Sequence, residues 1–596
     1  MGLSVLYSLL VSLVGALPIM LTPENNRWHE VARSSKIVAS VIAFVCYSVI
    51  SWVIIYFAQP SLVYPMWGWY FGLIVGWWVV SAIVAGTWSE MVFPVGWFPL
   101  GGLLVVLIVW VIGWSLFRAD EYYQIIGEVE TREWTADFSQ ADPKHLRMVP
   151  KESAKYRADT SLGNAKDAAI GSQFKIDYDH MTRQKVRGEL WWVVPLDYSR
   201  FTVWTSVDFI PGYIMIHAED PSRDVELVLD RKMVYSPGAS FHQNLERYLW
   251  ANGYSDEGMT DFSFEVDDDG NPWWIVTIFE PTIGYSGWKV TGIVMVNPET
   301  GEIMPKSPAE IPDFVDRVYP RNLAATYMSY WGNYWDGWGN AVWGKDNLRD
   351  PSPFGNETDA VELVFDHNGE PYWFTGITSS NQSDDALVGV MYMHSRTGKA
   401  VYYRVSGKTE MGILQSINTP EVIAQLGGEG TTPILYNFYG RPTWFSVLVT
   451  KDGVYKGVAL ADLDTSQVFF GKNQFEALRA LQSGLQVSGR QISPMPSSEL
   501  TAIEGPVERI GQEINNGRTI FYFYLTGSRQ LFSATTEISP EVPMTRVGDR
   551  VSVRVNDSSE AVIPIAIFEN LDLNIQYSPR EMELLPPAAL PAESEM

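Results

Sequence analysis

The sequence predicts a membrane α-helical bundle of four transmembrane helices, followed by α+β tandem repeats and a small C-terminal all-β barrel. Three observations predict this order. Four apolar stretches fill the first 117 residues, one short phrase recurs four times in the middle of the chain, and five short strand-like segments follow near the C-terminus. A transmembrane helix needs about 20 apolar residues, whereas short apolar or alternating segments between turn residues indicate strands.

The charges are spread unevenly over the 596 residues, whose formal net charge is −26. Residues 1–117 are neutral, so the whole net charge lies in residues 118–596. Because phosphate contacts need Lys and Arg, this acidic region argues against binding to nucleic acid or to anionic lipid. The single cysteine, Cys46, lies in an apolar stretch, which leaves no disulfide framework and no thiolate nucleophile in the polar part. Such a composition fits a bacterial or phage-encoded protein.

The four apolar stretches cover residues 3–21, 37–57, 69–87 and 98–117, and no charged residue interrupts them. We interpret them as retained transmembrane helices; a signal peptide in the first stretch is the alternative, but no basic segment precedes it. Three basic residues lie in the loop after the first stretch, which the positive-inside rule places in the cytoplasm. The prediction is therefore a multi-pass protein of the cytoplasmic membrane whose large C-terminal region is extracytoplasmic.

Small residues spaced by four begin the third stretch, at Gly68, Gly72 and Gly76. Glycines at this spacing allow two helices to approach closely. Packing within the bundle and self-association into a homo-oligomer are both open interpretations. No Asp, Glu, Lys, Arg or His lies inside the stretches, which argues against a transporter.

The recurring phrase is a glycine followed four residues later by a tryptophan. Its copies are Gly188 with Trp192, Gly270 with Trp274, Gly369 with Trp373, and Gly440 with Trp444. A second glycine, which opens an apolar run, follows each first glycine by 17 to 24 residues. Glycine supplies the positive φ of a tight turn, and a large aromatic ring stabilises a core. We expect each copy to be a hairpin whose Trp is buried against the helix of its repeat.

Two copies lead to a strand that ends in a Thr-Gly turn, at Asn297–Ile303 (NPETGEI) and His394–Ala400 (HSRTGKA). A helix followed by three strands with this ending resembles PepSY-like modules, over about residues 161–472. The resemblance implies small α+β domains that regulate proteases or contact proteins at the cell envelope, with no catalytic residues to transfer. A β-propeller is disfavoured, because the phrases lie 82, 99 and 71 residues apart and blades recur at shorter intervals.

The predicted domain boundaries follow from these patterns. They are a transmembrane anchor (1–117), a stalk (118–160), four repeats (161–235, 236–310, 311–410 and 411–497), an OB- or SH3-like barrel (498–578) and a disordered tail (579–596). Arginines in the barrel segment alternate with acidic residues, so a structural or protein-contact barrel is favoured over one that binds nucleic acid.

The third repeat contains the most unusual composition of the chain, the Trp-rich insertion at residues 327–343 (YMSYWGNYWDGWGNAVW). Its candidate binding residues are Tyr330, Trp331, Tyr334, Trp335 and Trp338. Helical spacing of the apolar residues favours a core helix. The alternative is a surface patch for a sugar, a peptide or the membrane interface, where Trp and Tyr are common.

Motifs for catalysis or metal binding are absent from the sequence. It has no GxSxG, SxxK or Walker A motif, and its histidines lack zinc-ligand spacing. Asp267 opens an acidic turn, but the twelfth position of a calcium loop would be Ile278, so a hairpin turn is favoured. A long-range cluster of His367 and His394 is the remaining option. We assign no catalytic residue, no metal site and no cofactor.

These observations favour a non-enzymatic binding, scaffold or regulatory protein, integral to the lipid bilayer, whose repeats contact a protein of the cell envelope. This hypothesis predicts that no cleft contains a compact cluster with His or with paired carboxylates. One alternative is an envelope glycan-binding protein or hydrolase that uses the Trp-rich insertion. Another is a protein that handles nucleic acid at the membrane through the C-terminal barrel.

Overall fold

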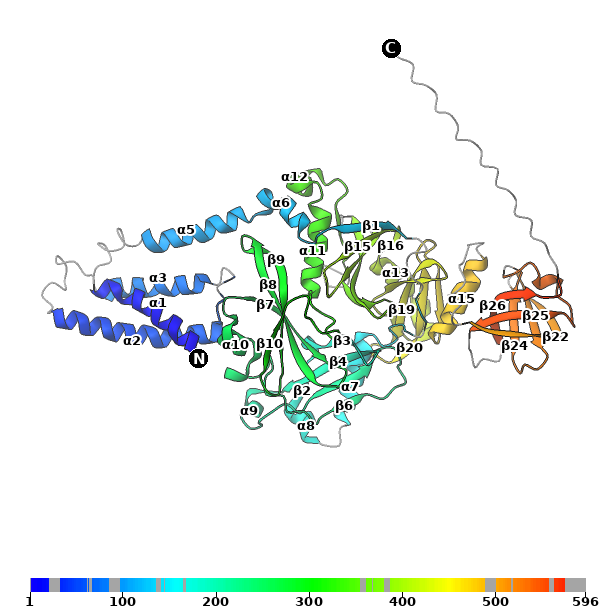
Figure 1. The fold of residues 1–596 in the computed structure, drawn as a ribbon, viewed down its shortest axis with the longest axis horizontal. Coiled ribbons are helices and arrows are strands. Elements are labelled where there is room, and N and C mark those ends of the chain that lie inside the picture. The colour runs from blue at the N-terminus through cyan, green and yellow to red at the C-terminus, as the bar shows by residue number, and fades with distance from the viewer. Residues whose placement is uncertain are drawn as a thin grey trace, which may run out of the picture. The chain divides into compact units, whose positions relative to one another are not determined.

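The computed structural model describes the chain except for residues 1, 21–32, 62, 64–66, 85–96, 135–140, 144, 165–167, 354–360, 367, 380–385, 488–499, 516–517, 537, 557–561 and 574–596. Two compact units divide the chain, Met1–Leu481 and Gln482–Met596. The first unit contains the N-terminal helices and four sheets, and the second contains a closed barrel (Figure 1).

Four apolar helices lie in the N-terminal region: α1 (Gly2–Met20), α2 (Arg33–Ala58), α3 (Trp67–Val84) and α5 (Trp97–Ile112). Among the described residues, one helical segment, Ser35–Ala58, is long and apolar enough to cross a membrane. At 1.5 Å per residue, the 16 residues of α5 extend about 24 Å, which is short of the roughly 30 Å hydrocarbon core.

The predicted fold class is therefore wrong in its four-helix transmembrane bundle, and the multi-pass prediction fails with it. The four sequence stretches were each near the required length, but α5 is 16 residues long, and the described residues of α1 and α3 give shorter apolar segments, Ser4–Leu17 and Gly68–Val84. Within the described residues, α2 is thus the one N-terminal helix of the kind that serves as a membrane anchor or a signal sequence.

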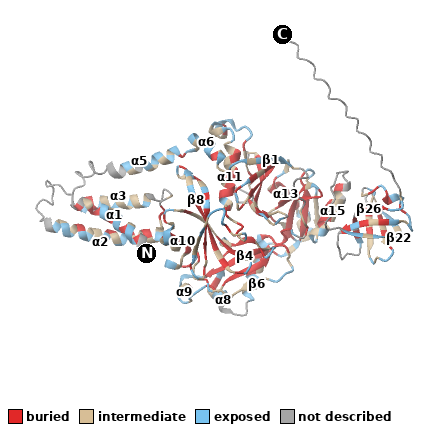
Figure 2. Ribbon diagram, in the orientation of Figure 1, coloured by how far each residue is buried: buried red, intermediate tan, exposed pale blue. Residues whose placement is uncertain are grey.

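One face of α2 packs on its neighbours and the other is exposed. Tyr47 stacks on Trp77 of α3 with ring centroids 4.2 Å apart, and its hydroxyl lies 2.9 Å from that of Ser81. Large apolar side chains on α2 remain exposed, among them Val41, Ile42, Val45, Val49, Val53 and Phe57. Figure 2 shows the contrast between these helices and the buried strands of the repeats.

Four repeats follow, each with a helical segment before an antiparallel sheet. The first contains α7 (Lys151–Gly163), α8 (Ala168–Gln173), β2 (Phe174–Ile176), β3 (Thr182–Val186), β4 (Glu189–Tyr198), β5 (Tyr213–His217) and β6 (Glu226–Val228). The second contains α10 (Leu245–Leu249), β7 (Gly258–Val266), β8 (Pro272–Ile283), β9 (Ser286–Val296) and β10 (Ile303–Lys306). Their strand orders are β2-β4-β5-β6, with β3 also on β4, and β10-β9-β8-β7.

The other two repeats follow the same plan. The third contains α11 (Arg321–Asn333), β11 (Arg349–Pro351), β12 (Glu362–Phe365), β13 (Pro371–Ser379), β14 (Ala386–His394), β15 (Ala400–Arg404) and β16 (Gly407–Lys408). The fourth contains α13 (Glu410–Ile417), α14 (Pro420–Leu426), β17 (Glu429–Gly430), β18 (Ile434–Phe438), β19 (Arg441–Val449), β20 (Tyr455–Asp462) and β21 (Val468–Gly471), and α15 (Gln474–Val487) follows it. The β1 strand (Val129–Glu133) joins the third sheet in parallel with β15.

The recurring phrase forms the same structure in all four repeats. Each first glycine has a positive φ, between 76° and 82°, in the turn that leads into the central strand. Glycine adopts this left-handed conformation without the steric cost that a side chain brings. The four tryptophans follow in the central strands and are at most 6% exposed.

Every one of these indole N–H groups donates to a backbone carbonyl that precedes the helical segment of its own repeat. The acceptors are Val149 for Trp192 (2.8 Å), Tyr235 for Trp274 (3.0 Å), Tyr319 for Trp373 (2.7 Å) and Lys408 for Trp444 (3.2 Å). A buried indole needs such a partner, because an unpaired donor costs free energy in a core. We call each of these pairs a tryptophan clamp.

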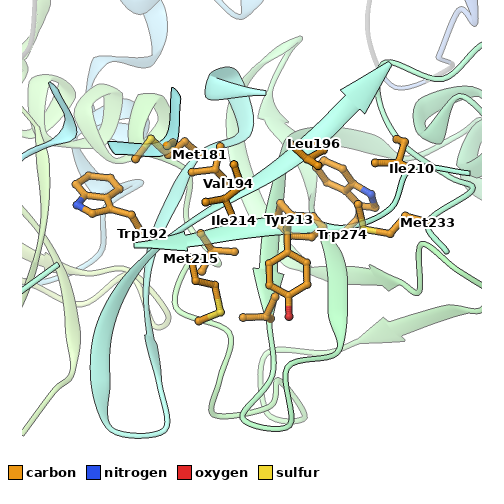
Figure 3. Close-up of a cluster of buried hydrophobic side chains, with 14 of the residues drawn as sticks. Met181, Trp192, Val194, Leu196, Ile210, Tyr213, Ile214, Met215, Met233 and Trp274 are labelled. Atoms are coloured by element: carbon orange, nitrogen blue, oxygen red, sulfur yellow. The ribbon is translucent and has the colours of Figure 1, made fainter. Parts of the chain in front are cut away.

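Neighbouring repeats share their cores. One buried cluster holds Trp192 of the first repeat and Trp274 of the second, and Figure 3 shows both rings among aliphatic and Met side chains. A second cluster joins the second and third repeats, and a third joins the third and fourth. The four repeats therefore form one continuous array, in which each sheet is stabilised by the next.

The second unit is a closed five-stranded barrel with the order β22-β23-β24-β26-β25. Its strands are β22 (Leu500–Asn515), β23 (Arg518–Leu525), β24 (Leu531–Thr535), β25 (Arg550–Asn556) and β26 (Val562–Asn570). The long β22 pairs with β25 up to Pro506 and with β23 from Val507. Gly505 and Pro506 stand where the strand changes partner, a position where these residue types mark bends.

Candidate functional site

A pocket of about 480 Å³ lies where the first, third and fourth repeats meet. This volume is within the range of sites that bind small molecules or short chain segments. Five aromatic side chains line it, Phe365, Tyr372, Tyr392, Tyr403 and Tyr436. Among the described residues, charged groups of both signs and a histidine also line it, Arg132, Asp142, His145, Lys185, Glu219 and Asp366.

Two of the recurring hairpin turns border this pocket. Gly188 ends the turn between β3 and β4, and Gly369 lies in the turn between β12 and β13. The Nζ of Lys185 donates to the carbonyl of Asn368 at 3.2 Å, which links the two turns. The recurring glycine turns of the first and third repeats therefore also form two edges of the pocket.

Tyrosines form the apolar wall. The rings of Tyr392 and Tyr403 meet edge to face at 5.9 Å, and the Tyr392 hydroxyl donates to the carbonyl of Leu435 at 3.3 Å. Burial raises the pKa of both Tyr392 and Tyr436. Their phenols stay neutral at ordinary pH and keep a proton to donate.

A histidine lies between two carboxylates at one side of the pocket. The Nδ1 of His145 is 3.2 Å from Glu219, and its Nε2 is 3.8 Å from Asp142. Burial raises the pKa of the Glu219 carboxyl, while His145 and the backbone N–H of Leu190 act in the opposite direction. The pocket thus contains a compact group of the kind that the non-enzymatic hypothesis did not expect.

Two buried arginines lie next to the aromatic wall. Arg147 donates to the carbonyl of Thr432 at 2.6 Å and lies 3.5 Å from Glu362. Arg183 packs over the ring of Trp192 at 5.3 Å, and its Nε and Nη1 have no hydrogen-bond partner among the described residues. Burial, and then the charge of Arg147, lower the pKa of Arg183 to about 10. Both guanidinium groups act electrostatically on the hydroxyl of Tyr436, so a positive potential lies behind this wall.

No residue of the Trp-rich insertion is among the described residues that line this pocket. Trp331 is buried in the core shared by the second and third repeats, 5.1 Å from the ring of Tyr402. Tyr330 and Tyr334 pack on Tyr122 of α6 (Ser115–Gln124), at 4.7 and 5.9 Å. The insertion therefore begins as a packed helix.

The rest of the insertion lies farther out. Trp335 is 44% exposed and donates to the carbonyl of Asp346 at 3.2 Å. Trp338, in α12 (Gly337–Gly339), meets Trp343 edge to face at 5.0 Å, and Trp343 is 76% exposed. The five candidate residues are thus divided between a core and an outer turn and do not form one site.

The remaining candidates have other surroundings. A Cβ built at Gly68, Gly72 or Gly76 would meet no atom within 4 Å, so no described helix packs closely there. Asp267 accepts hydrogen bonds from the backbone N–H groups of Asp269 (3.0 Å) and Asn271 (2.8 Å), as in a capped turn.

The two histidines considered for clustering cannot be compared, because His367 lies outside the described residues. His394 is 3.2 Å from Glu370. Within the described part of the chain, no group of three His, Cys, Asp or Glu side chains is placed to hold a metal ion.

Sequence patterns alone did not point to the pocket residues. The pocket residues come from β1, from the segment before α7, and from loops and strands of three repeats. The first and last of them are more than 300 residues apart in the sequence. The one available indication was the recurring phrase, because Gly188 and Gly369 line the pocket. The recurrence of the phrase indicated repeated architecture. Only the tertiary structure shows that two of its copies meet at one pocket.

No protein-family model matches the chain, and no curated protein matches it. Among solved structures, a xylan β-1,4-xylosidase from Bacillus halodurans C-125 matches at 12% identity over 70% of this chain and 59% of that chain, with a TM-score of 0.16. A puromycin-hydrolysing peptidase from Mycobacterium tuberculosis matches at 10% identity over 60% and 43%, with a TM-score of 0.15. An exo-1,5-α-L-arabinanase from a bovine ruminal metagenomic library matches at 9% identity over 65% and 95%, with a TM-score of 0.14. TM-scores this low carry no argument about the fold or the function.

Proposed function

We propose that this protein is a membrane-anchored binding protein whose repeats hold a polypeptide segment of an envelope protein in the pocket between them. The observation that carries the proposal is the pocket itself, about 480 Å³ in volume, with an aromatic wall and charges of both signs. The helix-then-strand order of the repeats supports the resemblance to PepSY-like modules, which implies contacts of this kind.

The proposed anchor is α2, whose exposed apolar face suits lipid. Arg33 and Lys36 lie at its N-terminal end, and basic residues favour the cytoplasmic side of a membrane. The C-terminal end of α2, to which Arg247 of the second repeat is hydrogen-bonded, is then on the extracytoplasmic side. This orientation places the repeats where an envelope protein can reach them.

The chemistry of the pocket favours a peptide that carries a carboxylate. A peptide side chain can enter the tyrosine wall, while Lys185 at the pocket attracts an acidic group; Arg132, the second cation there, is paired with Glu130 at 2.7 Å. The buried charges of Arg147 and Arg183 act in the same direction, because low-dielectric surroundings strengthen their field. Asp142, 3.8 Å from His145, and Asp366, which accepts from the backbone N–H groups of Asn368 and Glu370, add negative charge at the pocket and already have partners within the protein.

Blocking the pocket tests the proposal. Val401 lines it and is partly exposed, so Val401→Trp is expected to fill space that the ligand needs. Val454 is 41% exposed in a turn away from the lining residues, which makes Val454→Trp the matched control. The detergent-solubilised full chain is applied to arrays of acidic, amidated and neutral peptides and to an oligosaccharide array.

We expect acidic peptides to bind the natural chain and the Val454→Trp variant. The Val401→Trp variant is expected to lose this binding. Binding that all three chains share would contradict a role for the pocket. If the natural chain bound oligosaccharides and no peptide, the proposed peptide ligand would be wrong and a glycan would take its place in the proposal.

A hydrolase is the second candidate, because Glu219, His145 and Asp142 lie together at the pocket. A buried carboxyl with a raised pKa suits a general acid. Its carboxylate is already hydrogen-bonded by the protein, however, which favours a structural role. The hydrolase would be established if the natural chain hydrolysed a glycan or a peptide and the Glu219→Gln variant still bound that substrate but did not hydrolyse it.

A further inference from the structure

Three aromatic side chains gather beside the end of α2, two of them exposed and the third, Trp204, half-buried. Phe201 and Trp204 form α9 (Phe201–Trp204) and stack with centroids 5.6 Å apart, and Phe241 lies 6.1 Å from Phe201 and 5.6 Å from Trp204. Phe201 is 55% exposed and Phe241 is 41% exposed. We call these three residues the aromatic patch. Leaving such rings in water costs free energy, which a covering apolar phase would recover.

The patch continues onto the helix that fits a membrane span. Phe57, one residue before the end of α2, is 59% exposed and lies 6.5 Å from the ring of Phe241. If α2 crosses the bilayer, Phe57 lies where the span leaves it. The rings of Phe241 and then Phe201 extend sideways from that point.

A single arginine fixes this junction. Arg247, in α10, donates to the carbonyl of Tyr56 at 3.0 Å through Nε and to the carbonyl of Phe241 at 2.8 Å through Nη1. Its guanidinium also lies over the rings of Tyr56 (4.9 Å) and Phe57 (5.5 Å). The patch and the end of α2 are therefore held as one piece.

Further contacts reinforce the attachment. The indole N–H of Trp250 donates to the carbonyl of Pro60 at 3.3 Å, and the hydroxyl of Ser61 donates to the carbonyl of Glu257 at 3.1 Å. The second repeat thus cannot swing freely about the end of α2. A rigid attachment fixes which of its faces meets the membrane surface.

The backbone at Phe241 provides an independent observation. Its φ is +52°, in the left-handed region that a bulky side chain rarely adopts. A strained residue of this kind costs about 1–3 kcal/mol, and such residues concentrate at functional sites. Here the strain accompanies a phenyl ring that is 41% exposed.

We propose that Phe201, Trp204 and Phe241 form a membrane-contact surface that inserts into the headgroup region of the bilayer beside α2. The inference rests on the proposed anchoring of α2. Aromatic rings favour this interfacial layer, and Arg247 can keep its charge at the polar level while its stem packs on the rings. The contact sets the tilt of the repeat array and therefore the height of the pocket above the membrane.

Site-specific labels on the full chain in phosphatidylcholine nanodiscs test this. The only natural cysteine, Cys46, lies within the span and is exposed, so a fluorophore there reports on the anchor. In a Cys46→Ser background, the fluorophore is moved to Phe201→Cys, or to the neighbouring exposed Thr202→Cys if the first variant folds poorly. Phe475→Cys, at an aromatic residue that is 42% exposed on α15, is the matched control. Lipids with a nitroxide near the headgroup or near the chain end act as quenchers.

We expect the headgroup nitroxide to quench the label at 201 or 202 and to leave the label at 475 bright, and we expect the chain-end nitroxide to quench the label at Cys46. A quenched Cys46 label with no quenching at 201 and 202 would overturn the membrane-contact surface and leave the anchor standing. An unquenched Cys46 label would overturn the anchor and the surface with it. Equal quenching at 201 and 475 would show non-specific lipid contact and would overturn the surface alone.

Discussion

The tryptophans of the clamps and those of the Trp-rich insertion share one residue type and differ in their surroundings. The four clamp residues are buried in central strands, and each donates to a backbone carbonyl that precedes the helical segment of its own repeat. Trp335 lies in a turn and is 44% exposed, and Trp343 lies in a π-helical turn (Asn340–Gly344) and is 76% exposed. Trp331 of the same insertion is buried where α11 meets the shared core. The difference shows that the packing around the backbone decides whether a tryptophan is buried.

The largest expected effect comes from emptying a clamp. Trp444 is fully buried, so Trp444→Ala removes its ring contacts and leaves a cavity. We expect a loss of about 3–5 kcal/mol in the free energy of unfolding of the first unit. Denaturant unfolding followed by circular dichroism measures it. If Trp444→Ala lowered the free energy of unfolding no more than Trp343→Ala does, the distinction between clamp tryptophans and exposed tryptophans would be wrong.

The next effect concerns the charges buried among the clamps. Burial raises the pKa of Glu265 to about 7, and burial together with Glu265 raises the pKa of Asp316, whose backbone N–H donates to Glu265 at 3.1 Å. An unfolded glutamate has a pKa of about 4.3, so between about pH 4.3 and 7 the folded chain holds a proton that the unfolded chain releases. Stability is therefore expected to fall as pH rises through this window.

Glu265→Gln removes one titrating group, so the melting temperature of this variant is expected to fall less between pH 5 and pH 7.5 than that of the natural chain. Glu302→Gln, at an exposed position of the same repeat, is the control and is expected to leave the slope unchanged. If the melting temperature changed with pH in the same way in all three chains, Glu265 would not titrate in this range.

A smaller effect isolates the hydrogen bond of a clamp. Trp373→Phe keeps most of the ring and removes the N–H that donates to Tyr319 at 2.7 Å. Leaving that buried carbonyl without its donor is expected to cost about 1–2 kcal/mol. Thermal unfolding measures it. A neutral result would mean that ring packing alone accounts for the recurrence of tryptophan.

The smallest effect is expected in the insertion. Trp343 is 76% exposed, so Trp343→Ala is expected to change stability by no more than about 0.5 kcal/mol. The same unfolding experiment applies. A loss comparable to that of Trp444→Ala would indicate that the outer turn is covered in solution.

Local patterns predicted the parts of the fold that depend on near neighbours. The turn at Gly270 and the strand at Trp274 follow from a residue that tolerates positive φ and a ring that must be buried. The transmembrane prediction failed because average hydropathy measures composition, whereas spanning depends on the length over which one helix continues.

The sequence by itself determined that one unit recurs four times, because each glycine turn lies four residues before its tryptophan and the second glycine follows within 24 residues. Only the tertiary structure decided what those units surround. Lys185 meets Asn368, and Phe57 meets Phe241, through the stacking of repeats and the attachment of α2. Such contacts join residues about 180 positions apart, and no local pattern of charge or hydropathy encodes which copy of a repeat faces which.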